Sequence, residues 1–571
     1  MDYTITIGGE AGQGIQTIGG ALGKVFSRSG FHVFTHQDYE SRVRGGHNFY
    51  QIRVSERPVL SSRSGMDILV ALDRESIERH ARELKAGGVV IHDASALDTR
   101  YEGDAYIDVP LERMALEQGG NKVMSNAVAI GATLGVLGLE PDQLSGVFEG
   151  MLHSKGSEIV AGNVKAARAG YAHGAKECER CAFELARPGA VKMIIQGNDA
   201  IAFGALAAGC RFYSAYPMTP STGIMDYLAS KSKDYGIVVE QAEDEIAAIN
   251  MALGASYAGV RSMTGTSGGG FALMVEGLSL AAMTETPVVI VLAQRPGPAT
   301  GFPTRTEQGE LLFALHAAHG EFPRALFAPG DARQAFALTC KAFELAERYQ
   351  VPSIIMSDQH LADGEWTYDE FGLDSVPYMD HRLRGDRLQT LSEYRRHEFT
   401  AGGVSPLAVP GASRHLVVTD SDEHDEDGHI VEDAETRVKM VEKRLLKKMP
   451  LLREAIDPPQ LYGSASAEIV IVGWGSTYGI MKESVDHLSD HIDIAMLHFS
   501  EIYPFPDLVK AGLMETLTRA RLSVCIENNA TGQFARLVRA ETGYEFGARL
   551  TKYDGRPYML DDLLGGLHDL I

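Results

Sequence analysis

Short apolar runs of strand length alternate with longer segments of helical period along most of the chain. In residues 1–175, the first apolar run is followed by Ile15, Ile18 and Leu22, which recur at helical spacing. Strands that alternate with helices in this way favour a parallel sheet with helices packed on it. The strands predicted in this part are 4–7, 31–35, 67–73 and 88–93.

The alternation returns in two later parts of the chain, which indicates two more doubly wound sheets. Between these parts, residues 376–460 are rich in charged residues, Gly and Pro, with an acidic cluster at 420–427 and a charged helix predicted at 435–449. Such a composition is typical of a solvated connection. The strands predicted in the two later parts are 191–196, 211–216, 236–240, 260–264, 287–293 and 352–357, then 467–475, 492–497 and 522–527.

The predicted fold class is therefore α/β, with three successive doubly wound domains. A charged stretch that contains two cysteines separates the first domain from the second. The predicted parts are 1–176, a first α/β domain; 177–190, a linker; 191–375, a second α/β domain; 376–460, an extended charged connection with a helix; and 461–571, a smaller third α/β domain.

Charge and hydropathy narrow the range of partners. The net charge of −23, from 53 Lys and Arg against 76 Asp and Glu, would repel a phosphate backbone, so we expect no nucleic-acid partner. The longest apolar runs are far too short to cross a bilayer, and the first residues enter a strand without a signal or transit pattern. We therefore expect a cytoplasmic protein with no membrane partner.

The five cysteines are too few for a disulfide scaffold. Cys178 and Cys181, spaced as Cys-x-x-Cys, can bind a metal or form a redox pair, but we favour a solvated linker there. An iron–sulfur cluster needs about four thiolates, and the other three cysteines fall in predicted helices and strands. We therefore predict no cluster or metal site in this chain.

A first glycine cluster lies between the first strand and the first helix, where backbone N–H groups and the helix dipole can hold a phosphate. Its spacing is not that of the dinucleotide fingerprint, and a tight strand-to-helix turn explains some of the glycines. The compact basic turn at 42–46 can add phosphate contacts. The candidates for phosphate binding are Gly9, Gly12, Gln13, Gly14, Arg42 and Arg44.

A second motif, residues 216–222 with the sequence Tyr-Pro-Met-Thr-Pro-Ser-Thr, follows a predicted strand and leads into a helix. Ser221 or Thr222 as a helix cap, together with Pro220 at helix entry, accounts for much of the motif without any ligand. That interpretation does not readily explain Thr219. We therefore treat the motif as a candidate binding turn.

Glu245 opens an apolar helix that follows a predicted strand. Either Asp244 or Glu245 can simply be a favourable charge in the first helical turn. In the functional interpretation, Glu245 is a desolvated carboxylate, with the small residues Ala247 and Ala248 behind it. Such a carboxylate can hydrogen-bond a nitrogen of a flat heteroaromatic ring.

Two further turns follow predicted strands. Residues 267–270, a serine and three glycines, let the backbone approach a ligand closely. The later strand delivers Arg295 into a loop rich in Pro and Gly, at the end of the sheet where ligands bind in open α/β folds. An ordinary surface ion pair is the alternative for Arg295, but this loop favours carboxylate recognition.

Taken together, these stretches resemble the 2-oxoacid:ferredoxin oxidoreductase family, specifically the subunit in which a gamma domain is fused ahead of the alpha domain. The resemblance covers nearly the whole chain. Residues 9–14 with 42–46 match the gamma portion, 216–222 look like the substrate-site motif, and 295–304 are similar to the carboxylate-binding loop. Met218 replaces the Ile commonest in that motif, a change expected to be neutral.

The resemblance implies thiamine diphosphate as the cofactor and assigns roles to individual residues. Glu245 would bond N1′ of the aminopyrimidine and favour the imino tautomer that deprotonates C2, and the cofactor would supply the electron sink. Thr219 and Arg295 would contact the carboxylate and carbonyl end of the 2-oxoacid, and Thr304, with Arg305 as a further candidate, would lie near its side chain. The other residues implied in cofactor binding are Tyr216, Pro217, Ser267 and Gly268.

The resemblance also implies partners. Mg²⁺ at the diphosphate normally needs a Gly-Asp-Gly motif, which this sequence lacks. We therefore expect a beta subunit that carries Mg²⁺, the diphosphate site and a [4Fe-4S] cluster, in an (alpha-beta)2 heterotetramer that uses ferredoxin and coenzyme A. The domain at 191–375 would bind the pyrimidine. The domain at 461–571 resembles the transketolase carboxyl-terminal domain and would serve assembly and coenzyme A access, while the gamma domain would help to bind coenzyme A.

The reaction implied is oxidative decarboxylation of a 2-oxoacid with transfer of the acyl group to coenzyme A. We favour 2-oxoglutarate, because the fused type resembles that group most and because Thr304 and Arg305 can receive a second carboxylate. Pyruvate, a branched-chain 2-oxoacid or indolepyruvate in the same machinery is the alternative. A non-catalytic electron-transfer or nucleotide-binding protein built from the same units is the alternative of another class.

Overall fold

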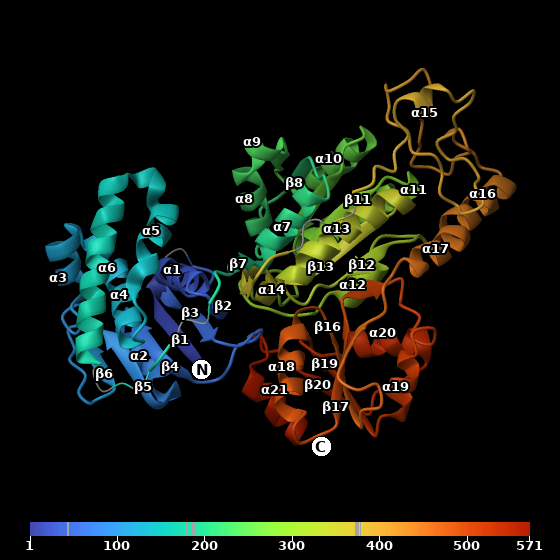
Figure 1. Ribbon diagram of the computed structural model, residues 1–571. Helices are drawn as coiled ribbons and strands as arrows, with labels where there is room; N and C mark the ends of the chain where they lie inside the picture. The colour runs from blue at the N-terminus through green and yellow to red at the C-terminus, as the bar shows by residue number, and fades with distance from the viewer. Residues whose placement is uncertain (43–44, 179–180, 182, 186–188, 372–375, 377) are drawn as a thin grey trace. The chain divides into compact units, whose positions relative to one another are not determined.

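The computed structural model describes residues 1–42, 45–178, 181, 183–185, 189–371, 376 and 378–571 (Figure 1). The chain divides into two compact units, each built of sheets and helices. The first comprises Met1–Ile195, Gly364–Phe371 and Met559–Asp569, and the second comprises Gln196–Asp363, Gly372–Tyr558 and Leu570–Ile571. The α/β fold class is confirmed. The five-part division predicted from the sequence stays a prediction.

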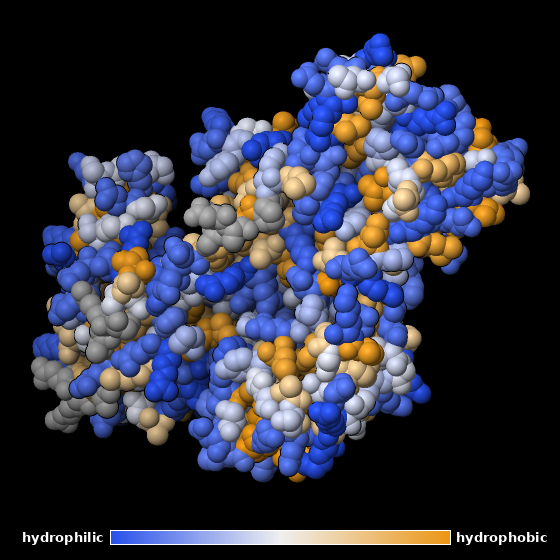
Figure 2. All heavy atoms as spheres, turned by 45° about the vertical axis from the view of Figure 1, so that its right-hand side comes forward, coloured by the Kyte–Doolittle hydropathy of each residue, from blue (hydrophilic) through white to orange (hydrophobic). Residues whose placement is uncertain are grey.

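The molecular face in Figure 2 is mostly hydrophilic, with hydrophobic residues scattered over it. In the parts of the chain that the structure describes, no helix is both long and apolar enough to cross a membrane.

The first unit is built on an eight-stranded sheet with the order β6-β5-β4-β1-β3-β2-β14-β7. Strands β1, β4, β5 and β6 are parallel, whereas β3 runs antiparallel to both β1 and β2. The strands are β1 (Asp2–Ala11), β2 (His32–Asp38), β3 (Gly45–Ser55), β4 (Met66–Ala71), β5 (Leu84–His92), β6 (Tyr106–Asp108), β7 (Met193–Gln196) and β14 (Glu365–Tyr368).

The prediction of a parallel sheet is therefore wrong for part of this unit. The sequence did not predict β3, because its polar residues interrupt any apolar run. One of them, Arg53, is buried and donates to both carboxylate oxygens of Asp2, at 2.9 and 2.7 Å. The strand predicted at 191–196 was assigned to the second domain, but as Met193–Gln196 it joins this sheet, as does β14.

Helices α1 (Ile15–Arg28), α4 (Ser125–Val136), α5 (Leu144–Leu152) and α6 (Ser157–Glu177) share one hydrophobic core with the sheet (Figure 1). Glycines bring α4 and α6 into backbone contact. A Cβ built on Gly131 would lie 1.8 Å from the carbonyl oxygen of Ala167, and one built on Gly170 would lie 2.2 Å from that of Val128. Larger residues at these two glycines would force the helices apart.

Cys178 and Cys181 form a disulfide just after α6. Cys178 is buried in the core of the first unit. The interpretation of this pair as part of a solvated linker is therefore wrong for Cys178. The remaining cysteines, Cys210, Cys340 and Cys525, are unpaired and buried.

The second unit contains a seven-stranded sheet with the order β18-β12-β13-β11-β10-β8-β9. All of its described pairs are parallel except β12 with β18. From β8 the chain moves to β9 on one side and then to β10 on the other, a change of direction at which α/β folds bind ligands. The strands are β8 (Phe212–Ala215), β9 (Val238–Gln241), β10 (Ser262–Thr266), β11 (Val288–Gln294), β12 (Ala325–Phe327), β13 (Pro352–Asp358) and β18 (Glu501–Tyr503).

Helices follow most of these strands, and the helices within 245–316 share one continuous core with the sheet and with the carboxyl-terminal part of the second unit. They include α7 (Gly197–Ala207), α8 (Thr222–Ser230), α10 (Glu245–Tyr257), α11 (Gly268–Met283), α12 (Leu311–His316) and α13 (Ala332–Tyr349).

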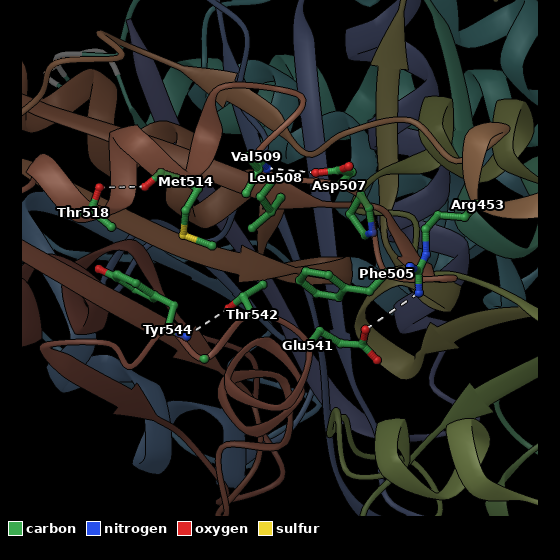
Figure 3. Close-up of a pocket in the computed structure, with 12 residues that line it drawn as sticks. Arg453, Phe505, Asp507, Leu508, Val509, Met514, Thr518, Glu541, Thr542 and Tyr544 are labelled. Atoms are coloured by element: carbon green, nitrogen blue, oxygen red, sulfur yellow. Dashed lines mark hydrogen bonds and ion pairs between the residues drawn. The ribbon is translucent and has the colours of Figure 1, made fainter. Parts of the chain in front are cut away.

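A five-stranded sheet with the order β15-β17-β16-β19-β20 completes the second unit. A hollow of about 570 Å³ lies beside it, with Phe505 and Tyr544 among its lining residues and an Arg453–Glu541 ion pair at 4.0 Å (Figure 3). The elements are β15 (Gln460–Tyr462), β16 (Ile469–Trp474), β17 (Ile494–Phe499), β19 (Leu522–Glu527) and β20 (Ala548–Thr551), with α18 (Tyr478–Leu488), α19 (Leu513–Arg519) and α20 (Gln533–Thr542).

The sequence predicted that the charged connection is solvated, but part of it is buried. The predicted helix is present as α16 (Ala434–Val441), a π-helical stretch (Glu442–Lys447) and α17 (Lys448–Glu454). Two of its lysines, Lys443 and Lys448, are fully buried. Composition alone could not predict this, because the lysines pair with a carboxylate from another part of the unit.

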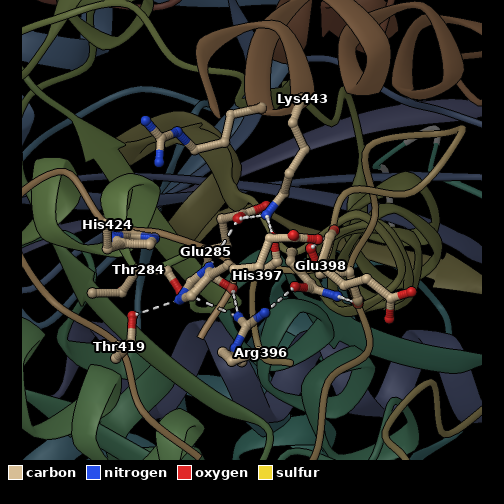
Figure 4. Close-up of polar contacts among 12 residues, drawn as sticks. Thr284, Glu285, Arg396, His397, Glu398, Thr419, His424 and Lys443 are labelled. Atoms are coloured by element: carbon tan, nitrogen blue, oxygen red, sulfur yellow. Dashed lines mark hydrogen bonds and ion pairs between the residues drawn. The ribbon is translucent and has the colours of Figure 1, made fainter. Parts of the chain in front are cut away.

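That carboxylate belongs to Glu285, which follows α11 (Figure 4). Its two oxygens accept from Lys443 Nζ at 2.6 Å and Lys448 Nζ at 2.5 Å, and His397 Nδ1 lies 3.2 Å away. Arg396 donates to the Glu285 carbonyl at 2.7 Å. We call Glu285, Arg396, His397, Lys443 and Lys448 the buried charge cluster. It attaches the charged connection to the core of the second unit.

Candidate active site

The predicted site residues of the second unit come from the carboxyl ends of four neighbouring strands. These ends lie at one edge of the sheet, because β8, β9, β10 and β11 are parallel. The turn 216–221 follows β8, Glu245 comes after β9, Ser267 directly follows β10, and Arg295 directly follows β11.

Glu245 is the first residue of α10 and is only 4% exposed. The capping role belongs to its neighbour, because the Asp244 side chain accepts from the Ala247 amide at 2.8 Å. Glu245 Oε1 is buried and has no hydrogen-bond partner in the described part of the chain. A buried carboxylate oxygen without a partner is costly, so its position indicates a ligand that donates to it.

The glycine turn forms the floor beneath this carboxyl. A Cβ built on Gly270 would lie 2.0 Å from Thr266 Oγ1 and 2.6 Å from Glu245 Oε1, so only glycine fits. Ser267, at the N-cap of α11, is fully buried, makes no side-chain capping bond and leaves its Oγ without a described partner. The first turn of α11 therefore presents uncapped backbone N–H groups beside two unpartnered side-chain oxygens.

Arg295 and the turn after β8 are in direct contact. Arg295 Nη1 donates to the carbonyl oxygen of Thr219 at 2.9 Å. Arg295 is partly buried, and this burial lowers its pKa. Tyr216 is 40% exposed at the start of the same turn, followed by Pro217. The structure therefore brings Arg295 and the backbone of Thr219 together, while their roles toward a 2-oxoacid stay predictions.

The far end of the Arg295 loop, residues 304–306, contacts another part of the second unit than Arg295 does. Thr304 is buried, and Arg305 Nη1 donates to its carbonyl at 3.4 Å. The next amide, of Thr306, donates to the carbonyl of Gly555 at 3.1 Å. The described contacts therefore hold this end of the loop on the carboxyl-terminal part of the second unit.

Sequence reasoning missed Glu310. Its carboxyl lies against Gly268 at the start of α11, and its Oε2 is buried without a described partner. Burial raises the pKa of Glu310 to about 8. The sequence does contain a signal for this residue, because Glu310 directly precedes the apolar run 311–315 at the start of a short helix.

The phosphate candidates of the first unit lie around the turn into α1. Gly12 and Gly14 have φ of 97° and 88°, and Gly9 is part of β1. Gly12 and Gln13 line a hollow of about 410 Å³, in which Gln13 Oε1 is already bonded to the Glu10 amide at 2.7 Å.

The basic turn at 42–46 adds little support for the predicted phosphate site. Arg42 is paired with Glu40 at 3.0 Å and is absent from the lining of this hollow. Arg44 lies outside the described residues.

Among the described residues, no group of three or more His, Cys, Asp or Glu side chains is placed to hold a metal ion.

Comparison with known families agrees with this arrangement. Residues 203–443 match the thiamine-diphosphate-binding family of pyruvate flavodoxin/ferredoxin oxidoreductases, and residues 4–173 match the pyruvate ferredoxin/flavodoxin oxidoreductase family. An alpha subunit of 2-oxoacid:ferredoxin oxidoreductase from Sulfolobus is 32% identical over 99% of this chain and 96% of its own length. The chain belongs to the 2-oxoacid:ferredoxin oxidoreductase family.

Two further relatives lie within this family. The 2-oxoglutarate oxidoreductase subunit KorA of Mycobacterium tuberculosis is 29% identical over 98% of this chain and 90% of its own length. The solved 2-oxoglutarate:ferredoxin oxidoreductase of Magnetococcus marinus, with 2-oxoglutarate, coenzyme A and succinyl-CoA bound, is 30% identical. It has a TM-score of 0.90 and the match covers 100% of this chain and 99% of that one. This oxidoreductase subunit thus shares its fold with that protein from end to end.

The residues of this oxidoreductase site fit the pyrimidine of thiamine diphosphate. The carboxyl of Glu245 is buried with an unpartnered oxygen, and Gly270 leaves no side chain between that oxygen and the start of α11. A flat ring that bears a donor would satisfy the oxygen and occupy the glycine-lined space.

Proposed function

We propose that this chain is the fused gamma-alpha subunit of a 2-oxoglutarate:ferredoxin oxidoreductase. The reaction is the coenzyme A-dependent oxidative decarboxylation of 2-oxoglutarate to succinyl-CoA and CO2, with electrons passed to ferredoxin. The observation that carries the proposal is the buried Oε1 of Glu245, which has no hydrogen-bond partner in the described part of the chain and lies in the thiamine-diphosphate-binding domain. The substrate assignment is supported by the names of the Magnetococcus and Mycobacterium relatives.

Glu245 would hold N1′ of the aminopyrimidine, with Ser267 and Gly268 at the start of α11 and Tyr216 and Pro217 in the neighbouring turn. Thiamine diphosphate, when bound, supplies an electron sink for decarboxylation. The burial of Glu245 strengthens its hydrogen bond to the ring, since water does not compete for the carboxyl. Its task is to hold a proton shared with the ring nitrogen.

Arg295 and Thr219 would orient the 2-oxoacid by its carboxylate and carbonyl oxygens. Arg295 is a suitable group, because a guanidinium offers paired donors to a carboxylate. Partial burial removes competing water around it. Thr304 and Arg305 would receive the second carboxylate of 2-oxoglutarate.

The rest of the machinery would come from a beta subunit that holds Mg²⁺ and a [4Fe-4S] cluster, in an (alpha-beta)2 assembly. The sequence has no Gly-Asp-Gly motif of its own, which supports this division of labour. In the first unit, coenzyme A would be bound with the help of Gly9, Gly12, Gln13, Gly14, Arg42 and Arg44. The hollow beside Gly12 and Gln13 supports that assignment.

The substrate is tested by assaying the complex of this chain and its beta subunit with a panel of 2-oxoacids. We expect the highest kcat/KM with 2-oxoglutarate, read as coenzyme A-dependent reduction of ferredoxin. A preference for pyruvate of about tenfold or more, equivalent to about 1.4 kcal/mol, would overturn the substrate assignment. Failure of every 2-oxoacid in a folded, cofactor-loaded complex would overturn the proposed reaction itself.

Arg295→Ala is expected to raise KM for every 2-oxoacid by about 30-fold or more, since loss of a half-buried, charge-assisted contact costs about 2–5 kcal/mol. The affinity for thiamine diphosphate, measured by calorimetry, should change by less than about threefold. Arg305→Ala is the matched comparison, because it should raise KM for 2-oxoglutarate but not for pyruvate. Equal loss of substrate and cofactor binding in Arg295→Ala would mean that Arg295 is only structural.

A further inference from the structure

Glu310 is a buried acid that the proposed mechanism does not use. A Cβ built on Gly268 would lie 1.3 Å from Glu310 Oε1, so this carboxyl occupies the space above the first glycine of α11. The other oxygen, Oε2, is buried and has no hydrogen-bond partner in the described part of the chain. The carboxyl group therefore lies at the first glycine of α11, next in sequence to Ser267, whose Oγ is also buried without a described partner.

The backbone around Glu310 is held firmly from two sides. Its own amide donates to Gln294 Oε1 at 3.0 Å, at the end of β11 and one residue before Arg295. On either side, Gln533 of α20 donates to the Gly309 carbonyl at 2.6 Å and accepts from the Leu312 amide at 3.0 Å. These three bonds fix the backbone position from which the Glu310 side chain extends.

Charges near Glu310 set its protonation state. Burial and, to a smaller extent, the negative charge of Glu307 raise its pKa, the positive charge of Arg295 opposes both effects, and the net result is a pKa of about 8. The effect is mutual, because Glu310 raises the pKa of Arg295 against the effect of burial. Arg295 from the loop after β11 and Glu307 from the same loop are the charged groups that act on it. The neutral form is the one that suits a carboxyl packed against Gly268 with a buried, unpartnered oxygen, because burial disfavours the charged form.

We propose that Glu310 is a proton-carrying positioning residue of the substrate pocket, whose neutral form leaves the charge of Arg295 to the carboxylate of the 2-oxoacid. Once ionised, Glu310 competes for that guanidinium and repels the incoming anion. Glu310 forms no covalent bond to substrate or cofactor, and its only chemical step is the loss of its carboxyl proton to solvent or the return of that proton. The inference rests on the proposed function, since it assumes that Arg295 receives a 2-oxoacid.

The first test is the pH dependence of kcat/KM for 2-oxoglutarate, measured on the complex with the beta subunit. In the natural chain, KM should rise by about tenfold for each pH unit above about 8, while kcat changes little. Glu310→Gln, which is uncharged at every pH and nearly the same size, should remove this rise.

Glu307→Gln is the matched control on the same loop. It should keep the rise and move it to lower pH, because it removes a negative charge that favours the neutral acid. A rise in KM that is unchanged in Glu310→Gln would overturn the inference while leaving the proposed function intact. Loss of activity with every 2-oxoacid in the natural complex would instead be a failure of the proposed function.

A second test does not depend on activity. Infrared difference spectra of the full chain between pH 7 and pH 9 should contain a carbonyl stretch of a protonated carboxylic acid that disappears as pH rises. The band should be absent from Glu310→Gln and present in Glu307→Gln. If the natural chain and Glu310→Gln give the same difference spectrum, then Glu310 is not the proton carrier. If Glu310→Gln is too unstable for study, Glu310→Ala serves for the same measurement.

Discussion

Glu245→Gln is expected to slow exchange of the C2 proton of bound thiamine diphosphate by about 10²–10⁴-fold, the range typical for loss of a positioned acid–base group. An amide can still hydrogen-bond a ring nitrogen, but it cannot share a proton with it as a carboxyl does. Gln matches Glu in size, so the contact with Gly270 is kept and the fold should be intact. The measurement is deuterium exchange at C2, followed by NMR in the complex with the beta subunit.

Asp244→Asn is the matched control for this experiment. Asp244 caps α10 from the neighbouring position, and Asn caps a helix about as well, so both stability and C2 exchange should stay near those of the natural chain. Calorimetry should also find that Glu245→Gln still binds the cofactor in the complex, weakened by no more than about tenfold. Exchange at the natural rate in Glu245→Gln would refute the role of Glu245.

Glu285→Gln is expected to destabilise the charged connection by about 3–5 kcal/mol, the usual result of removing one partner from a buried ion pair. Lys443 and Lys448 would lose their shared carboxylate while both remain fully buried. The pKa of Lys443 is already lowered by burial to about 8, and removal of the carboxylate would lower it further. Hydrogen exchange of residues 394–405 and 440–448 should therefore be faster by about 10²-fold to 4 × 10³-fold, since 1.4 kcal/mol corresponds to a factor of ten.

An exposed ion pair on the same helix gives the control. Glu435 and Lys439 lie 2.6 Å apart on α16 with most of their surface in water, so Glu435→Gln should change exchange by less than about fivefold. If Glu285→Gln changes exchange no more than Glu435→Gln does, the buried charge cluster does not stabilise the connection.

Acid should weaken the attachment of the charged connection through the buried charge cluster in the natural chain. The pKa of Glu285 is held well below its usual value, mainly by the two lysines against the opposing effect of burial, and burial holds the pKa of His397 well below 6.5. A carboxylate with a lowered pKa contributes stability above about 4.5 and loses it as pH falls further. A histidine buried as the neutral form contributes stability above about 6.5, because below that pH only the unfolded chain takes up the proton. Protection of residues 394–405 should thus fall from pH 7 to pH 4.

Local sequence patterns predicted the strands and glycine turns that carry Glu245, Ser267 and Arg295. Each of these residues follows an apolar strand of a parallel sheet, and such strand ends necessarily share one edge. The contact between Arg295 and Thr219 follows from that rule, since β8 and β11 both flank β10.

The features that the sequence did not predict depend on partners far away in the chain. Arg53 is buried in β3 with Asp2 as its partner, and the backbone on either side of Glu310 is held by Gln533, more than 200 residues later. Lys443 and Lys448 belong to a segment whose composition is that of a solvated helix. Their burial follows from the bonds that they make to Glu285, which is far away in the sequence. Hydrophobic periodicity and residue spacing describe neighbours along one helix or strand, so they cannot predict contacts between residues that are far apart in the sequence.

The eight-stranded sheet has a consequence for how the protein is made. Its strand β14 (Glu365–Tyr368) is synthesised long after the other strands, and helix α21 (Leu560–His568) of the same unit comes close to the end of the chain. At ~5–20 residues per second, β14 leaves the ribosome on the order of ten to thirty seconds after residue 195. Until then β2 has an open edge that can pair with other nascent chains. A chaperone that shields this edge during translation should therefore increase the yield of the native subunit.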